Sequence, residues 1–138
     1  MLFPKKVKYR KWHTMRRNPK RVGPATRGTT VAFGSFGLKA MANARVRSQQ
    51  IEAARKVLSR SIGKTGRLWI RIFPDMPYTK KPAEVKLGKG KGDLEGYSAP
   101  VLPGRIIFEV DGITDTMARE ALRKAGTKLP LKTKVVAR

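Results

Sequence analysis

The chain has 138 residues, with 32 Lys or Arg against 9 Asp or Glu and a formal net charge of +23. Its length suggests one domain, and the absence of Cys excludes disulfide bridges, thiolate nucleophiles and Cys-ligated zinc. Charge of one sign at this density opposes compaction unless a polyanion compensates it, and a phosphate backbone is the commonest such partner. We therefore expect a nucleic-acid-binding protein.

Residues 1–28 are predicted to form a basic RNA-binding arm. No acidic residue precedes Glu52, and only four Leu, Ile, Val or Phe residues lie in the arm. Aromatic rings alternate with cations, so rings can stack on bases while charges meet phosphates. The alternative is a solvated basic tail with incidental aromatic residues. The expected RNA contacts in the arm are Lys5, Lys6, Lys8, Tyr9, Arg10, Lys11, Trp12, His13, Arg16, Arg17 and Arg21.

The folded domain is expected to span residues 29–138 and to begin with a short β-prone segment at 30–33, which the Gly-rich residues 34–37 would interrupt. A helix is predicted over 49–62, with Ser48 as its N-cap and a glycine directly after its end. Its predicted inward stripe is Ile51, Ala54, Leu58 and Ile62, and its other face offers Arg55 and Arg60 as candidate RNA contacts.

Three strands and a second helix are predicted in the C-terminal half. The strands are expected at 67–73, 105–110 and 132–136, and Arg71 in the first is a further candidate RNA contact. The helix is expected over 115–125, capped by Thr114 or Asp115 and ended by Gly126; its predicted inward residues are Met117, Ala118, Ala121, Leu122 and Ala125. The pattern predicts an α+β fold, with two helices packed on a mostly antiparallel β-sheet.

A long connection at residues 79–92 separates the two central predicted strands and alternates Gly with Lys. Loops of this length are often functional, and glycines let a backbone approach a ligand closely. The alternative is a flexible connector with solubilising lysines. The candidate functional residues of this loop are Lys80, Lys81, Lys86, Gly88, Lys89, Gly90, Lys91 and Gly92.

Enzyme chemistry has little support in the sequence. The spacing of Gly88, Gly90 and Gly92 is not that of a dinucleotide fingerprint, and a phosphate-loop pattern ending at Gly63 would need glycine where Leu58 stands. The single histidine, His13, has no credible nucleophile or metal partner. We expect no catalytic residue, no metal and no cofactor.

Several segments resemble the family of bacterial large ribosomal subunit protein sixteen, orthologous to the archaeal and eukaryotic L-ten-e group. They are PKKVKYRK at 4–11, QQIEAAR at 49–55, WIRIFPD at 69–75, TKKPAE at 79–84, GKGKG at 88–92, PGR at 103–105, AREAL at 118–122 and KLPLKTK at 128–134. The sequence departs from the family at Lys86, where many bacterial members look to have Arg, and at Trp12, and it matches loosely over 15–27.

The resemblance implies a structural constituent of the large ribosomal subunit that binds large-subunit rRNA near the peptidyl transferase centre. It implies that the loop points towards that centre and contacts aminoacyl-site tRNA, with peptidyl-site tRNA as a further candidate. Neighbouring ribosomal proteins are expected partners, in a cytoplasmic or organellar ribosome.

Two rival functions are a free-standing nucleoid or RNA-chaperone protein and a membrane-active cationic protein. The second needs a basic amphipathic helix, and neither predicted helix is long or hydrophobic enough to favour it. No membrane partner is therefore expected.

Overall fold

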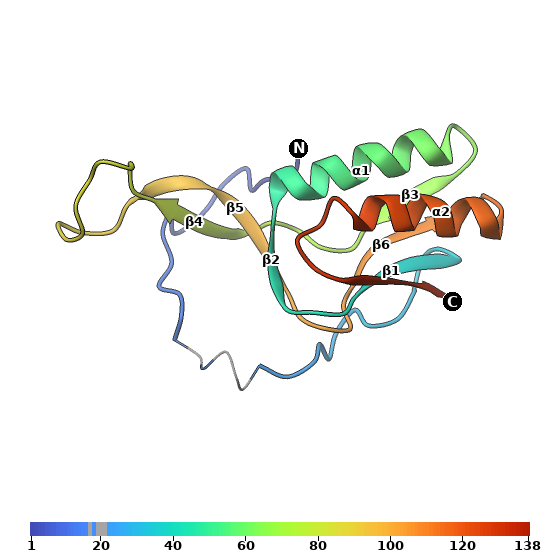
Figure 1. Ribbon diagram of the computed structural model, residues 1–138, viewed down its shortest axis with the longest axis horizontal. Helices are drawn as coiled ribbons and strands as arrows, with labels where there is room; N and C mark the ends of the chain where they lie inside the picture. The colour runs from blue at the N-terminus through green and yellow to red at the C-terminus, as the bar shows by residue number, and fades with distance from the viewer. Residues whose placement is uncertain (17, 19–21) are drawn as a thin grey trace.

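A computed structural model describes residues 1–16, 18 and 22–138 (Figure 1). The predicted RNA contacts Arg17 and Arg21 lie outside the described residues. No helix in the described part of the chain is long and apolar enough to cross a membrane.

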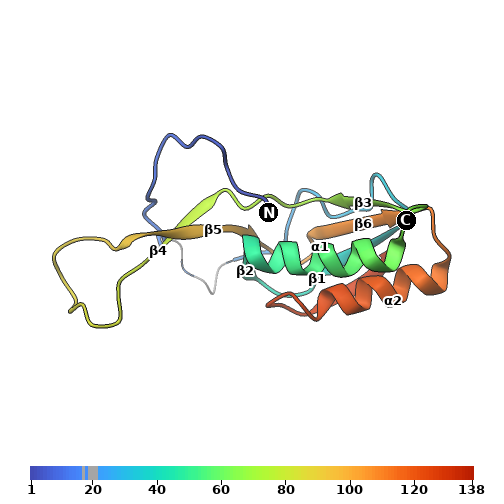
Figure 2. The same ribbon diagram turned by 90° about the horizontal axis from the view of Figure 1, so that it is seen from above.

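Two helices pack on one face of a four-stranded antiparallel sheet, which confirms the α+β prediction. The strand order is β3-β6-β1-β7, and Figure 2 shows both helices on the same side of β3 and β6. The elements are β1 (Phe36–Ala40), α1 (Ser48–Ile62), β3 (Arg67–Ile70), β6 (Ile106–Asp111), α2 (Asp115–Gly126) and β7 (Thr133–Ala137).

A second antiparallel sheet carries the long loop away from this domain. Its order is β2-β5-β4, and its strands are β2 (Ala44–Arg47), β4 (Met76–Lys80) and β5 (Asp93–Val101). Strands β4 and β5 form a hairpin that projects beyond the helices (Figure 1). Because Thr79 and Lys80 belong to β4, the connection that remains outside the strands is residues 81–92, which we call the hairpin tip.

The helical stripes meet the central strands in one hydrophobic core. The four predicted inward residues of α1 are buried, as are those of α2 except Met117, whose predicted burial is wrong because it is 48% exposed. Residues 106–110 of β6 are all buried. Both faces of β6 are covered, one by the helices and the other by the segment before β1, so its side chains do not alternate between core and solvent.

The helix boundaries differ slightly from those predicted. Arg47, not Ser48, is the N-cap of α1, and its backbone N–H donates to Gln50 Oε1 at 2.9 Å. Gly126 is the last residue of α2 rather than the residue after it, and Thr127 is the C-cap. Shifts of one residue are usual at helix ends, where the hydrogen-bond pattern frays.

The strand predicted at 30–33 is absent, and β1 forms instead from Phe36, so that it includes Gly37, one of the two glycines expected to interrupt it. Glycine is needed there for close packing rather than for a turn. A Cβ on Gly37 would lie 2.8 Å from Val31 Cγ2, and one on Gly34 would lie 2.5 Å from the Val110 carbonyl oxygen. The segment before β1 can therefore lie directly against the sheet.

Strands β2, β4 and β5 were not predicted because their sequences carry weak strand signals. Pro77 lies in β4, an edge strand, and both Gly96 and Pro100 lie in β5, the central strand of its sheet. Proline lacks the N–H that a ladder uses, and it argues against a central strand when only sequence is considered. Strand β3 also ends earlier than predicted, at Ile70, although the Arg71 N–H still donates to the Ile107 carbonyl at 2.8 Å.

Candidate nucleic-acid interface

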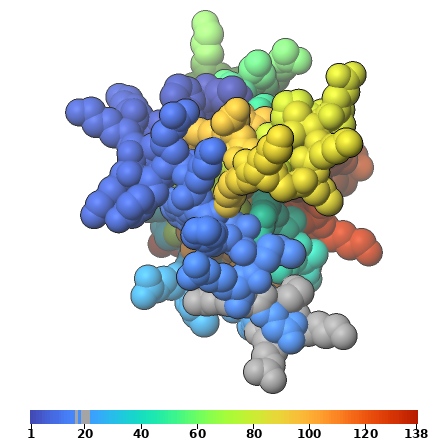
Figure 3. Space-filling model, turned by 90° about the vertical axis from the view of Figure 1, so that its left-hand side faces the viewer, coloured from blue at the N-terminus to red at the C-terminus, as the bar shows by residue number. Residues whose placement is uncertain are grey.

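The arm and the hairpin lie side by side at one end of the molecule. Figure 3 shows the arm in blue beside the hairpin tip in yellow. Lys91 Nζ donates a hydrogen bond to the Trp12 carbonyl, and Lys11 Nζ donates to the Lys91 carbonyl at 3.5 Å. Lys11 Nζ also lies 3.8 Å from Asp93 Oδ1. Two segments about eighty residues apart in the sequence are thereby joined.

The described residues of the arm present their charges and rings to solvent. Lys8 Nζ lies 5.5 Å from the centre of the Tyr9 ring, so cation and aromatic face are already combined there. The predicted RNA contacts in the arm that the structure describes are all exposed: Lys5, Lys6, Lys8, Tyr9, Arg10, Lys11, Trp12, His13 and Arg16. The arrangement suits a ligand with both phosphates and bases.

The hairpin tip has an internal framework that its glycines make possible. Lys81 Nζ donates to the Gly88 carbonyl at 2.5 Å, so this lysine braces the tip. Residues 88–90 all have positive φ, a region that glycine adopts without strain. A Cβ on Gly92 would lie 2.7 Å from the Lys80 carbonyl oxygen, so glycine is required where the tip closes onto β4.

The cations of α1 differ in how available they are. Arg55 donates to both carboxylate oxygens of Glu52, at 2.9 and 2.7 Å. This hydrogen bonding outweighs the effect of burial and lowers the pKa of Glu52 to about 2. Arg60 is exposed in the last turn of α1, and α1 runs away from the hairpin (Figure 1). The structure therefore does not bring Arg60 onto the face shared by the arm and the hairpin tip.

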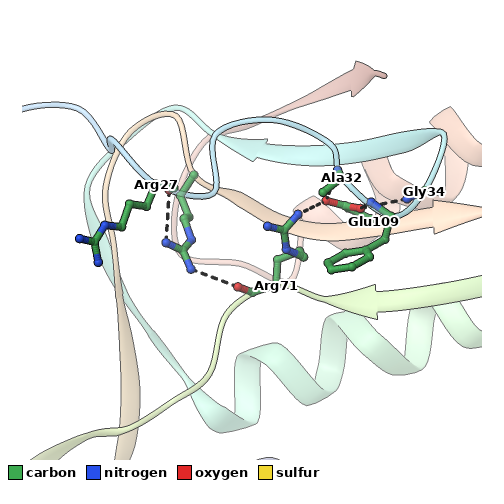
Figure 4. Close-up of polar contacts among 7 residues, drawn as sticks. Arg27, Ala32, Gly34, Arg71 and Glu109 are labelled. Atoms are coloured by element: carbon green, nitrogen blue, oxygen red, sulfur yellow. Dashed lines mark hydrogen bonds and ion pairs between the residues drawn. The ribbon is translucent and has the colours of Figure 1, made fainter.

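Arg71 has an intramolecular role. Its guanidinium forms an ion pair with Glu109, which has no exposed surface, and only 20% of the Arg71 side chain is exposed (Figure 4). Glu109 also accepts backbone N–H groups from Ala32 at 3.0 Å, Phe33 at 2.6 Å and Gly34 at 3.0 Å. The RNA contact of Arg71 stays a prediction. Its contribution to the fold is the ion pair with the buried Glu109.

Glu109 remains a carboxylate despite its burial. Burial raises the pKa of a carboxyl group, but the three backbone N–H groups and Arg71 together outweigh this, and the pKa of Glu109 lies below its usual value. The ionised side chain holds the segment before β1 on the sheet. It thereby positions Phe33, whose ring stacks on Trp69 with centroids 6.2 Å apart.

Two residues that sequence reasoning did not select occur on the same face as the arm and tip. Arg45, at the edge strand β2, lines a cavity together with arm residues. Leu87, between Lys86 and Gly88 in the tip, is 98% exposed. A large apolar side chain directly before the Gly-Lys run at 88–92 was a signal for Leu87, whereas nothing in the sequence around Arg45 distinguishes it from other surface cations.

The comparisons with known proteins agree with one another. Residues 4–136 match the family described as ribosomal protein L16p/L10e. Proteins named large ribosomal subunit protein uL16 align with the whole chain: that of Thermosipho melanesiensis is 55% identical with 94% of its length covered, that of Afipia carboxidovorans 54% with 98%, and that of Erythrobacter litoralis 56% with 93%. The chain therefore belongs to the ribosomal protein L16p/L10e family and is a ribosomal protein rather than an enzyme.

Proposed function

We propose that this protein, a structural constituent of the large ribosomal subunit, binds large-subunit rRNA through its arm and presents the hairpin tip to tRNA. The aminoacyl-site tRNA is the first candidate and the peptidyl-site tRNA the second, both near the peptidyl transferase centre. The observation that carries the proposal is the joining of arm and hairpin on one cationic face.

The distribution of acidic residues supports this assignment. The helices and the central sheet neutralise many of their own cations through the ion pairs Glu52–Arg55, Glu109–Arg71, Asp115–Arg119 and Glu120–Lys124. The arm contains no carboxylate, and the tip contains only Glu84 beside Lys81, Lys86, Lys89 and Lys91. On this face Lys11 pairs with Asp93 and Lys80 with Glu95, both at 3.8 Å. The remaining cations of the arm and tip have no carboxylate partner among the described residues and are left for an external polyanion, as phosphate binding requires.

The tip is suited to holding RNA backbone rather than to reading sequence. Its exposed lysines supply positive charge, and phosphate contacts position a ligand without selecting bases. Lys86 and Lys89 are exposed and have no hydrogen bond or ion pair to any other described residue. We propose that these two side chains, rather than the bracing Lys81, meet tRNA.

Sedimentation tests the ribosomal assignment against the free-standing nucleoid or chaperone alternative. In a sucrose gradient of a cell lysate at moderate salt, the protein should migrate with the large subunit. Recovery at the top of the gradient, or with nucleoid DNA, would favour the alternative. The tRNA assignment needs a second measurement, because a protein can enter the subunit without contacting tRNA.

The double variant Lys86→Ala/Lys89→Ala separates folding and assembly from tRNA contact. We expect a nearly unchanged melting temperature, because exposed substitutions usually cost within about 0.5 kcal/mol, and normal entry into large subunits. Gradient-purified mutant ribosomes should bind aminoacyl-site tRNA more weakly than ribosomes with the control Lys64→Ala/Lys128→Ala, which removes two exposed lysines outside arm and tip. Equal tRNA binding by both variants would contradict a tRNA contact of Lys86 and Lys89 and would leave the tip as a connection between β4 and β5.

A further inference from the structure

A cavity of about 650 Å³ lies between the arm and the second sheet. Ligand sites for small molecules typically measure about 300–1,000 Å³, so the cavity is large enough for one nucleotide. The arm contributes one wall, and the three strands of the sheet contribute the other. The lining residues are Trp12, His13, Thr14, Met15, Arg16, Arg45, Met76 and Pro100.

The two walls differ in chemistry. On the sheet side, Met76 is only 7% exposed, and Pro100 offers an apolar ring without an N–H. On the arm side, Trp12 is 40% exposed, so part of its surface is open to a ligand. These residues together form an aromatic and apolar surface of the kind on which unpaired bases stack.

Two guanidinium groups complete the cavity. Arg16 and Arg45 are exposed, and neither guanidinium group has a hydrogen bond, ion pair or ring contact with another described residue. No carboxylate is among the lining residues. The cavity therefore combines an apolar interior with available, planar cations, which match a phosphate group in geometry and charge.

The cavity is held in place from both sides. Arg45 pairs directly with Pro100 in the antiparallel β2–β5 ladder, so the sheet fixes their spacing. Lys91 donates a hydrogen bond to the Trp12 carbonyl, and Lys11 contacts Asp93, the first residue of β5 after the hairpin tip. The arm residues that line the cavity thus follow directly after an anchored point of the chain.

We propose that this cavity holds one unpaired RNA nucleotide, with its base against Trp12 and Met76 and its phosphate at Arg16 and Arg45. The inference rests on the proposed rRNA binding by the arm. A base inside a duplex is stacked on both faces and cannot enter a concave site, whereas a base in a loop or bulge can be splayed out and stacked on an aromatic side chain. An acidic peptide would satisfy the guanidinium groups but would leave the aromatic wall unused.

Trp12 provides a direct optical test. The chain has two tryptophans, so the full-length variant Trp69→Phe leaves Trp12 as the only one. The probes are a short single-stranded RNA and an RNA duplex with the same number of phosphates, at a salt concentration where both bind. We expect the single strand to quench Trp12 fluorescence and the duplex to leave it nearly unchanged. Equal quenching by the two probes would overturn the proposal.

Substitutions test the two halves of the site. Trp12→Leu should weaken single-strand binding, measured by filter retention, by at least about fivefold, which corresponds to a stacking contribution of ~1 kcal/mol, and should leave duplex binding unchanged. Arg45→Gln should weaken single-strand binding more than the matched control Lys64→Gln, which removes one exposed charge from the turn after α1. Equal losses in Arg45→Gln and Lys64→Gln would contradict a specific phosphate contact.

A glutamate homopolymer distinguishes a nucleotide site from a general anion site. If the peptide quenches Trp12 as strongly as the single-stranded RNA at equal charge, the nucleotide assignment is wrong. Failure of this inference is distinguishable from failure of the proposed function. If the protein still migrates with large subunits but binds single-stranded and duplex RNA without discrimination, only the cavity assignment is refuted.

Discussion

Replacing Glu109 with Gln tests whether the buried carboxylate holds the segment before β1 on the sheet. Glu109 Oε1 accepts from Arg71 and from the Ala32 N–H, and Oε2 accepts from the Phe33 and Gly34 N–H groups. Glutamine has a single acceptor oxygen. In either orientation of its amide, two of these four contacts are lost and an NH₂ group faces donors.

The expected cost of Glu109→Gln is about 3–5 kcal/mol. Two lost hydrogen bonds to a charged group, at ~1.5–3 kcal/mol each, give about 3–6 kcal/mol. Measured losses on breaking a buried ion pair, about 3–5 kcal/mol, estimate the same loss independently and narrow the range. This is a large share of the ~5–15 kcal/mol that stabilises a typical domain. Urea unfolding at neutral pH, followed by circular dichroism, should show a clearly lower midpoint with an unchanged slope.

The pH dependence gives an independent readout. The folded-state pKa of Glu109 is lower than its usual value of 4.5, because the backbone N–H groups and Arg71 outweigh the burial that would raise it. Its ionisation therefore contributes stability that is present above about pH 4.5 and is lost as the pH falls through the folded-state pKa. The wild-type protein should lose more stability than Glu109→Gln over this acidic range.

Glu120→Gln is the matched control, because it removes a carboxylate of an exposed ion pair with Lys124 on α2. Exposed pairs contribute little to stability, so its unfolding midpoint should stay close to that of the wild type. If Glu109→Gln loses no more stability than Glu120→Gln, the role assigned to the buried carboxylate is wrong.

Three further predictions concern packing, electrostatics and the arm. Gly34→Ala should lose about 1–3 kcal/mol in thermal unfolding, because its Cβ would meet the Val110 carbonyl oxygen, whereas Gly23→Ala, in open space, should not. Affinity for an rRNA fragment should fall linearly with salt on logarithmic axes, by a slope of about −0.7 to −0.9 per phosphate contacted; a flat response would contradict phosphate binding. Deleting residues 1–22 should preserve cooperative unfolding but weaken large-subunit incorporation, and loss of cooperativity would place the arm in the core.

The structure also sets where such a deletion must stop. The Ala25 N–H donates to the Pro103 carbonyl, and the Gly28 carbonyl accepts from the Ile106 N–H, both at 2.8 Å. The last residues of the predicted arm are therefore hydrogen-bonded to the folded domain. Leu2, at the other end of the arm, packs against the core, so a small loss of stability is expected even from a well-placed truncation.

The sequence by itself determined the features that depend on local pattern. Apolar residues at helical spacing, such as Ile51, Ala54 and Leu58, placed both helices to within one residue and identified their buried faces except at Met117, because one face of a helix must meet the core. The acid-free arm and the lysines of the tip are visible as composition, and charge of one sign without internal partners indicates a polyanionic ligand whatever the fold.

Only the tertiary structure decided the features that join distant residues. The sequence around Arg71 gives no sign of its ion pair with Glu109, because Glu109 lies 38 residues away along the chain. The pairing of β5 with both β2 and β4 offsets the weak strand signals of Gly96 and Pro100. The contact between Lys91 and Trp12 exists only because that hairpin returns beside the arm. Local propensity carries no information about such contacts, since their stability arises from chain segments that meet only after folding.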